Sequence, residues 1–158
     1  IMELKQYLID TFQFNDHANK MILSRIKELP ENKESIRFFS HLINSQIKWL
    51  ERIHVYPNDP NLDWWEPAYP LEELESRWDD SLAKWINFLE NNSEESLYLE
   101  RKFIGFDGSV FSAPLKDIAL QLNYHSIHHR AQIQTIIRQQ GLQPDFIDYI
   151  ATKYKKLS

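Results

Sequence analysis

The sequence has no cysteine and only three glycines among its 158 residues. Without cysteine the chain has no disulfide framework, no zinc site built on thiolates and no cysteine nucleophile. The shortage of glycine predicts long helices and few tight turns. No stretch resembles a signal peptide, and no apolar run approaches the roughly 20 residues that cross a bilayer. The sequence therefore predicts a cytoplasmic chain that does not span a membrane.

Basic residues are also scarce, because 18 Lys and Arg stand against 23 Asp and Glu and leave a net charge of −5. The acidic residues gather between Glu66 and Glu100, and the only basic run lies at the end of the chain, over 153–156. Nucleic-acid binding usually needs a basic face, since neutralisation of phosphates supplies most of the affinity. The charge pattern therefore predicts no nucleic-acid partner.

Apolar periodicity and stop signals predict five helical segments. Four are long and one is short, and they cover about 3–29, 35–55, 71–89, 114–141 and 144–154. Prolines and a glycine mark their ends, since Pro suits a first helical turn and Gly a C-terminal cap. A chain of 158 residues fits one domain, 1–158. The predicted fold class is therefore all-α: a four-helix bundle with short connections and a short C-terminal fifth helix.

Two connections are predicted to be non-helical. The segment 56–69 is rich in proline and contains Trp64 and Trp65, which we expect to plug one end of the bundle, with the rim of a pocket as the alternative. The segment 97–112 alternates polar and apolar residues around Asp107 and Gly108. This pattern predicts a hairpin or an irregular turn.

Three of the six histidines lie close together in the fourth predicted helix, at 125, 128 and 129. His125 and His129 are four positions apart and therefore lie on one face, which also carries the apolar residues at 115, 118, 122, 133 and 136. Two imidazoles on a core face need a partner. A divalent metal ion fits two stacked ring nitrogens, and two hydrogen-bonded core histidines are the alternative.

A catalytic zinc-type site usually has three protein ligands, so a third must come from another helix. The candidates are His17 in the first predicted helix and His41 and His54 in the second. Helical phase slightly favours His54, at the edge of the apolar stripe, over His41 on its shoulder. His54, however, lies at the predicted helix end, where phase is a weak guide.

Two motifs resemble the DinB/YfiT-like family. The stretch His41–Arg52, in which a histidine is followed eight residues later by Trp-Leu-x-Arg, resembles the second-helix motif of that family. The run Asn123–Gln132 is similar to its fourth-helix motif, in which two histidines precede Arg-Gly-Gln, and Ala131 stands here where the family usually has glycine. The resemblance covers nearly the whole chain.

The resemblance implies a DinB-like four-helix bundle with a metal site formed by His41, His125 and His129. It also implies a divalent ion, usually nickel or zinc, with water completing the coordination, and a homodimer. Family members of known activity include thiol-dependent transferases and isomerases. Because this chain lacks cysteine, such a thiol would come from a low-molecular-weight cosubstrate.

Four further residues of the motifs and first helix have predicted roles. Gln132 lies close enough to the ligand face to hydrogen-bond a ligating histidine. His128 points about 60° away from that face and is expected to rim the pocket or contact a partner. His17 is expected near the site or exposed on the first helix. Arg130 is expected on the polar face, in a salt bridge to the third helix or a second subunit.

Rival metal sites fit the sequence less well. Glu51 and His54 form one Glu-x-x-His pair of the kind that di-iron bundles use twice, but the segment 115–141 contains no glutamate. Ser126 occupies the place of the glutamate in a His-Glu-x-x-His protease motif. The leading hypothesis is a metal-dependent transferase that acts on a small-molecule substrate with a thiol. A metal-dependent hydrolase and a non-catalytic ligand-binding bundle are the alternatives.

Overall fold

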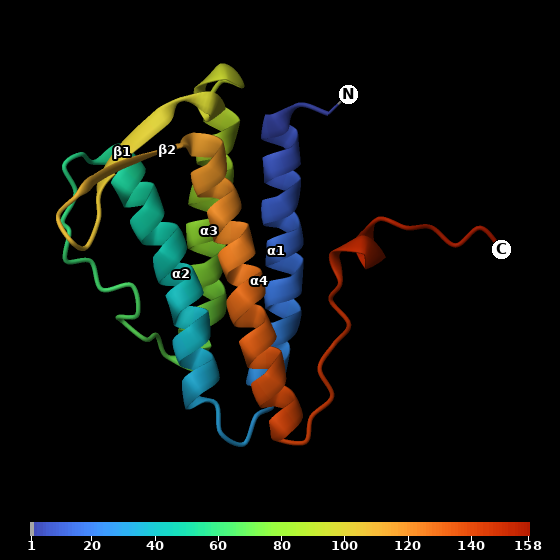
Figure 1. The fold of residues 1–158 in the computed structure, drawn as a ribbon. Helices are drawn as coiled ribbons and strands as arrows, with labels where there is room; N and C mark the ends of the chain where they lie inside the picture. Colours follow the sequence, from blue (N-terminus) through green and yellow to red (C-terminus); the bar gives the residue numbers. More distant parts are fainter. Residues whose placement is uncertain (1) are drawn as a thin grey trace.

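Four long helices lie side by side in the computed structural model, which describes residues 2–158 (Figure 1). They are α1 (Leu4–Ile26), α2 (Lys33–His54), α3 (Leu74–Asn91) and α4 (Leu115–Gln139). The sequence predicted these four helices with ends that differ by at most three residues. A 3-10 turn, Leu71–Glu73, leads into α3. No helix within residues 2–158 combines the length and the apolar character needed to cross a membrane.

Helices α2 and α3 run in the same direction. Gln46 contacts Ser81, and His54, farther along α2, packs against Phe88 farther along α3. The chain therefore returns along the bundle between them, over residues 55–70, as Figure 1 shows on the outer side of α2. The sequence predicted a non-helical connection over 56–69, but the prediction of a bundle with short connections did not include this course along the length of α2. Helix α4 packs against both α1 and α2, so two of its faces are buried.

An antiparallel hairpin joins α3 to α4, as the alternating pattern predicted. It consists of β1 (Glu100–Ile104) and β2 (Val110–Pro114), with Phe103 opposite Phe111. Gly108 lies in the turn with φ of 80°, a conformation that glycine adopts without steric cost. A β-carbon at Gly105 would meet the ring of Phe111 at 2.5 Å, so a larger residue there would require the Phe111 side chain to move.

The predicted fifth helix is not confirmed. Residues 142–148 have no regular structure, and only a 3-10 turn, Tyr149–Thr152, follows before the chain extends away from the bundle (Figure 1). Arg25 holds the irregular stretch through two hydrogen bonds to Asp145, at 2.9 and 3.0 Å. Phe146 and Ile150 remain exposed. Leu142 and Ile147 pack against the core without a helix, and a segment this short is marginal as a helix by itself.

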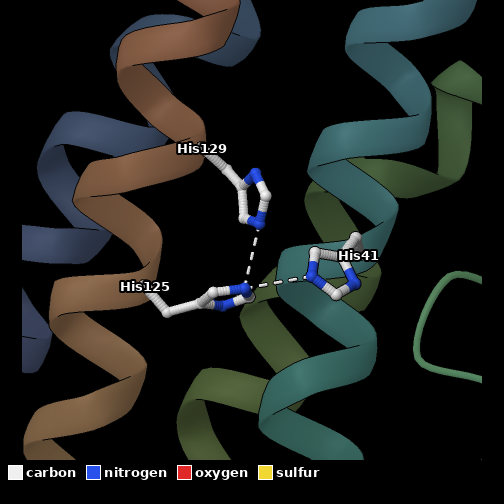
Figure 2. A group of neighbouring side chains, drawn as sticks. All are labelled: His41, His125 and His129. Atoms are coloured by element: carbon white, nitrogen blue, oxygen red, sulfur yellow. Dashed lines mark hydrogen bonds between the residues drawn. The ribbon is translucent and has the colours of Figure 1, made fainter.

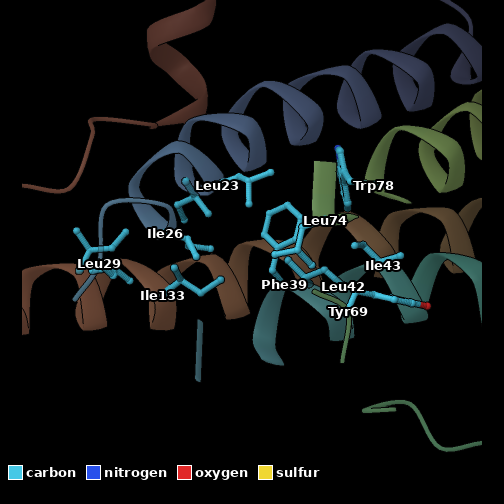
Figure 3. Close-up of a cluster of buried hydrophobic side chains, with 12 residues drawn as sticks. Leu23, Ile26, Leu29, Phe39, Leu42, Ile43, Tyr69, Leu74, Trp78 and Ile133 are labelled. Atoms are coloured by element: carbon cyan, nitrogen blue, oxygen red, sulfur yellow. The ribbon is translucent and has the colours of Figure 1, made fainter. Parts of the chain in front are cut away.

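The core consists of two apolar clusters separated by buried polar residues. One cluster, shown in Figure 3, joins the end of α1, the first half of α2 and the end of α4 around Trp78. The other joins the start of α1 and of α4 around Trp85. Between them along the helices lie buried polar residues: Asn15, Asn19, Asn44, Ser45, Gln46, Ser81, Asn123, Ser126, His129 and Arg130. The candidate site lies in this polar middle of the bundle.

Arg130 is part of the buried polar layer, so its predicted salt bridge on the polar face is wrong. It is 4% exposed and donates hydrogen bonds to Asn15 Oδ1 at 2.7 Å, Asn19 Oδ1 at 2.6 Å and Ser126 Oγ at 3.2 Å. Burial lowers its pKa to about 10, which leaves it charged at neutral pH. The sequence analysis assigned one buried face to this helix. The prediction for Arg130 failed because α4 buries a second face against α1.

Replacement of Arg130 by alanine should destabilise the fold by about 3 kcal/mol, because it leaves Asn15 Oδ1 buried without a partner and removes the shortest hydrogen bond to Asn19 Oδ1. Urea unfolding followed by circular dichroism measures the change. Arg138→Ala, which removes an exposed arginine from the same helix, should leave the unfolding midpoint nearly unchanged. Equal midpoints for the two variants would contradict a structural role for the Arg130 hydrogen bonds.

Candidate metal centre

Three imidazole rings meet between α2 and α4. His41 comes from α2, and His125 and His129 come from successive turns of α4 (Figure 2). The Nε2 atom of His125 lies 3.0 Å from Nε2 of His41 and 2.9 Å from Nε2 of His129. Two nitrogens bound to one ion at 2.0–2.1 Å are separated by roughly 3 Å. The three nitrogens are therefore spaced as ligands of a single ion would be.

Oxygen acceptors fix the other nitrogen of two of these rings. His41 Nδ1 lies 2.7 Å from the carbonyl oxygen of Trp64, and His129 Nδ1 lies 2.6 Å from Gln132 Oε1. Each Nδ1 must carry the hydrogen, because a carbonyl or amide oxygen only accepts. In the neutral rings, Nε2 of His41 and of His129 therefore has a free lone pair. This arrangement is typical of histidines that bind metals through Nε2.

The short contacts leave one nitrogen pair without a hydrogen. Neutral His125 can carry a hydrogen on Nε2 and donate it to either His41 or His129, but not to both. The other contact, about 3 Å long, then has no hydrogen along it, and if His125 carries its hydrogen on Nδ1 instead, both contacts place two lone pairs against each other. A cation at the common point removes this repulsion. The group consists of three histidines and contains no carboxylate. Each ring can present a nitrogen lone pair, so the group fits a divalent metal ion in chemistry as well as in spacing.

Burial keeps the three rings neutral, which is the state that binds metal. Removal from water lowers the pKa of His41 and of His125 to about 4, and it also lowers the pKa of His129. The neighbouring histidines act in the same direction, because a second positive charge in the group would be repelled. Protons therefore compete weakly for these nitrogens at neutral pH.

The crossover closes one side of the site with Trp65. The Trp65 ring stacks on His41 with centroids 3.7 Å apart and planes 7° from parallel. Helix α2 holds the crossover in place, because Lys48 donates to the Glu66 carbonyl at 2.9 Å and Asn44 to the Pro67 carbonyl at 3.0 Å. The two tryptophans were expected to plug one end of the bundle, and this expectation is wrong. They line a cavity instead, which was the alternative. They lie beside the middle of the bundle because the crossover passes His41 on its way to α3.

The other histidines lie apart from this group. His54, which helical phase slightly favoured, is exposed and packs edge-on against Phe88. His17 is exposed on α1, in a hollow with Thr152 and Lys153. His128 is exposed, with its ring centroid 4.9 Å from that of His129. Within residues 2–158, His41, His125 and His129 are the only His, Cys, Asp or Glu residues grouped closely enough to hold an ion.

A cavity of about 520 Å³ opens beside His41 and His125. It runs from the histidines toward the hairpin, and most of its walls are aromatic: Trp49, Trp64, Trp65, Phe103, Phe106 and Phe111. Among the residues that line it, Arg52 is the one cation and none is a carboxylate. Sequence periodicity did not reveal this cavity, because its walls come from α2, the crossover, the hairpin and α4.

Comparison with known proteins agrees with this geometry. The model of the DinB family matches residues 2–156. The chain belongs to the DinB family. No curated protein and no solved structure matches it. The family assignment confirms the resemblance of the two motifs in this DinB-family chain.

The stability of the metal-free protein should fall between pH 7 and pH 5. An unfolded histidine has a pKa of about 6.5, and the folded values for His41 and His125 are about 4. Between these values the unfolded chain binds more protons, so stability is fully present above pH 6.5 and decreases by up to about 1.4 kcal/mol per pH unit for each such histidine. Urea unfolding of chelator-treated protein at several pH values measures the slope.

The matched variants are His41→Gln, which removes one of the buried rings, and His17→Gln, which removes an exposed one. His41→Gln should reduce the slope, and His17→Gln should retain it. A wild-type stability that does not change over this pH range would contradict the burial of neutral histidines.

Proposed function

We propose that this DinB-family chain is a metal-dependent enzyme in which His41, His125 and His129 hold one divalent ion, nickel or zinc. The observation that carries the proposal is the grouping of three ring nitrogens within 4.8 Å of one another, with His125 Nε2 at 2.9–3.0 Å from the other two Nε2 atoms and with Nδ1 of those two rings tied to oxygen acceptors. Gln132 and the Trp64 carbonyl keep the two rings in the metal-binding tautomer. Their neutral state at pH 7 supports the same assignment.

The proposed reaction is transfer of a group to or from a small-molecule thiol. A bound divalent ion lowers the pKa of a coordinated thiol or water and so supplies a nucleophile at neutral pH. The chain has no cysteine, so the thiol belongs to a low-molecular-weight cosubstrate. The aromatic walls of the cavity exclude water around an apolar electrophile.

The cavity favours thiol transfer over hydrolysis. Attack by water is usually assisted by a general base, commonly Glu, Asp or a free His. No Asp or Glu lines this cavity, and the two histidines that line it are those assigned to the metal. A metal-bound hydroxide still carries a proton that such a base usually transfers to the leaving group, whereas a thiolate carries none. A non-catalytic ligand-binding bundle is the remaining alternative, and turnover distinguishes it.

Protein purified without chelators should contain about one metal ion per chain by elemental analysis. His125→Ala and His129→Ala should each lower the metal affinity by more than about tenfold, because each removes one of three ligands. Metal at about 100 times its dissociation constant should stabilise the wild type by about 2.7 kcal/mol in thermal unfolding. His17→Ala, which changes an exposed histidine outside the group, should behave like the wild type.

Unchanged metal content and thermal stability in both α4 variants would rule out the metal centre. If the wild type binds metal, assays with a panel of low-molecular-weight thiols and apolar electrophiles test the reaction. Turnover that requires the thiol and disappears in His129→Ala supports the transferase. Hydrolysis without thiol would favour the hydrolase, and no turnover in either assay would favour the binding bundle.

We also propose that the chain forms a homodimer, as the family resemblance implies. Large apolar side chains are exposed on the neighbouring helices α1 and α4, where Tyr7 is 47%, Tyr124 64% and Ile127 50% exposed. Such a patch is typical of a contact between proteins. Sedimentation equilibrium should give twice the chain mass of 19.0 kDa, and Ile127→Glu should shift it toward the monomer. A wild-type protein that sediments only as a monomer would contradict the dimer.

A further inference from the structure

Arg52 occupies an aromatic pocket at the far end of the cavity from the histidines. Its residue is 7% exposed, and it lines the same cavity as His41 and His125. The guanidinium carbon lies 4.8 Å from the ring centroid of Trp49, 4.7 Å from Trp64 and 5.0 Å from Phe103. The three rings therefore surround the planar cation at distances typical of cation–π contacts, and the same side chain lines the cavity.

The hydrogen-bonding capacity of Arg52 is largely unused. A guanidinium has five N–H donors, but Arg52 makes one hydrogen bond, from Nη2 to the Ile104 carbonyl oxygen at 3.3 Å, and its buried Nε has no partner. None of the ion pairs found among residues 2–158 includes it. Two other arginines have more hydrogen-bond partners than Arg52. Arg25 binds both oxygens of Asp145, and Arg130 has three oxygen partners.

An unpaired cation in an apolar site is energetically costly, and an anion that enters the site removes part of that cost. Burial lowers the pKa of Arg52, yet an arginine stays protonated at neutral pH. Its fork of donors matches a carboxylate, which it can bind through two parallel hydrogen bonds. Since Arg52 is the one cation in the cavity wall, a group with a single negative charge fits better than a phosphate dianion.

The separation from the histidines sets the length of the ligand. His41, Ser45, Trp49 and Arg52 lie on one face of α2 and all line the cavity. The guanidinium lies over Trp49, which is eight residues beyond His41, or about 12 Å along the helix axis. A molecule that reaches both ends of the cavity is therefore elongated, and the walls between them are mostly aromatic.

We propose that Arg52 binds the carboxylate of an elongated substrate whose apolar body lies along the aromatic walls and whose reacting end faces the three histidines. The carboxylate contact follows from Arg52 alone, while the orientation of the reacting end rests on the proposed metal-dependent function. The sequence motif placed Arg52 on the second helix without assigning it a role.

The first experiment compares octanoate with 1-octanol, which has the same chain length but no charge. Tryptophan fluorescence reports binding, because Trp49 and Trp64 contact the guanidinium. The full chain is measured as purified and after dialysis against a chelator. Octanoate should bind at least about tenfold more tightly than 1-octanol in both preparations, as expected for a charge-assisted pair of hydrogen bonds. Arg52→Gln should abolish this preference, and Arg52→Lys should retain part of it.

The controls separate this inference from the proposed metal centre. His41→Gln changes the histidine end of the cavity and should retain the preference for octanoate in chelator-treated protein. Equal binding of octanoate and 1-octanol to the wild type would overturn the inference, and this comparison needs no variant to fold. Octanoate binding that requires metal and survives Arg52→Gln would also overturn it, because the carboxylate would then bind at the histidines.

A second experiment tests the orientation in metal-loaded protein. Cobalt(II), whose absorption spectrum changes when a thiolate binds, replaces the native ion. 8-Mercaptooctanoate should bind about tenfold more tightly than 8-mercapto-1-octanol, whereas 3-mercaptopropionate, too short to reach Arg52, should have no advantage over 3-mercapto-1-propanol. An equal advantage for the short acid would overturn the proposed distance between the two ends. Failure to load cobalt would instead contradict the metal centre and leave the octanoate result intact.

Discussion

The close approach of three imidazole rings, held together inside the bundle, is the constraint on which the other features of the site depend. His41, His125 and His129 are neutral because burial disfavours their charged forms, and hydrogen bonds from Nδ1 turn two of the Nε2 lone pairs inward. Neutral rings alone do not satisfy every contact. The packing of α2 against α4 therefore maintains an arrangement that a cation completes, which is the basis of the proposed metal centre.

The parallel course of α2 and α3 explains how the site obtains its walls. A chain that leaves the end of α2 must travel back along the bundle before α3 begins, and residues 55–70 do so on the outer side of α2. This path places the Trp64 carbonyl and the Trp65 ring against His41. The hairpin supplies the opposite end of the cavity through Phe103 and Phe111. The helices hold the histidines, and the connections provide the surfaces that contact a ligand.

Local pattern was sufficient for the helices, the hairpin and the pair His125 and His129, because each depends on residues close together in the sequence. The third histidine was different: helical phase slightly favoured His54, and only the family motif pointed to His41. The buried position of Arg130 also escaped prediction, since a periodic pattern cannot show that a helix packs against neighbours on two sides. The fifth helix failed for another reason: the segment is short, and its apolar residues Leu142 and Ile147 pack against the core from an irregular backbone.

The two buried faces of α4 have a consequence for how this chain can change during evolution. Insertion or deletion of one residue between Asn123 and Arg130 would rotate part of the helix by about 100°, moving the imidazoles and the arginine out of register together. A change of length in this stretch is therefore expected to disrupt both the histidine group and the buried polar layer, and the same holds for the part of the crossover that contacts His41. The exposed turn at 106–109 has no such contact with the histidines, so changes of length there can alter the far end of the cavity while the histidine end stays the same.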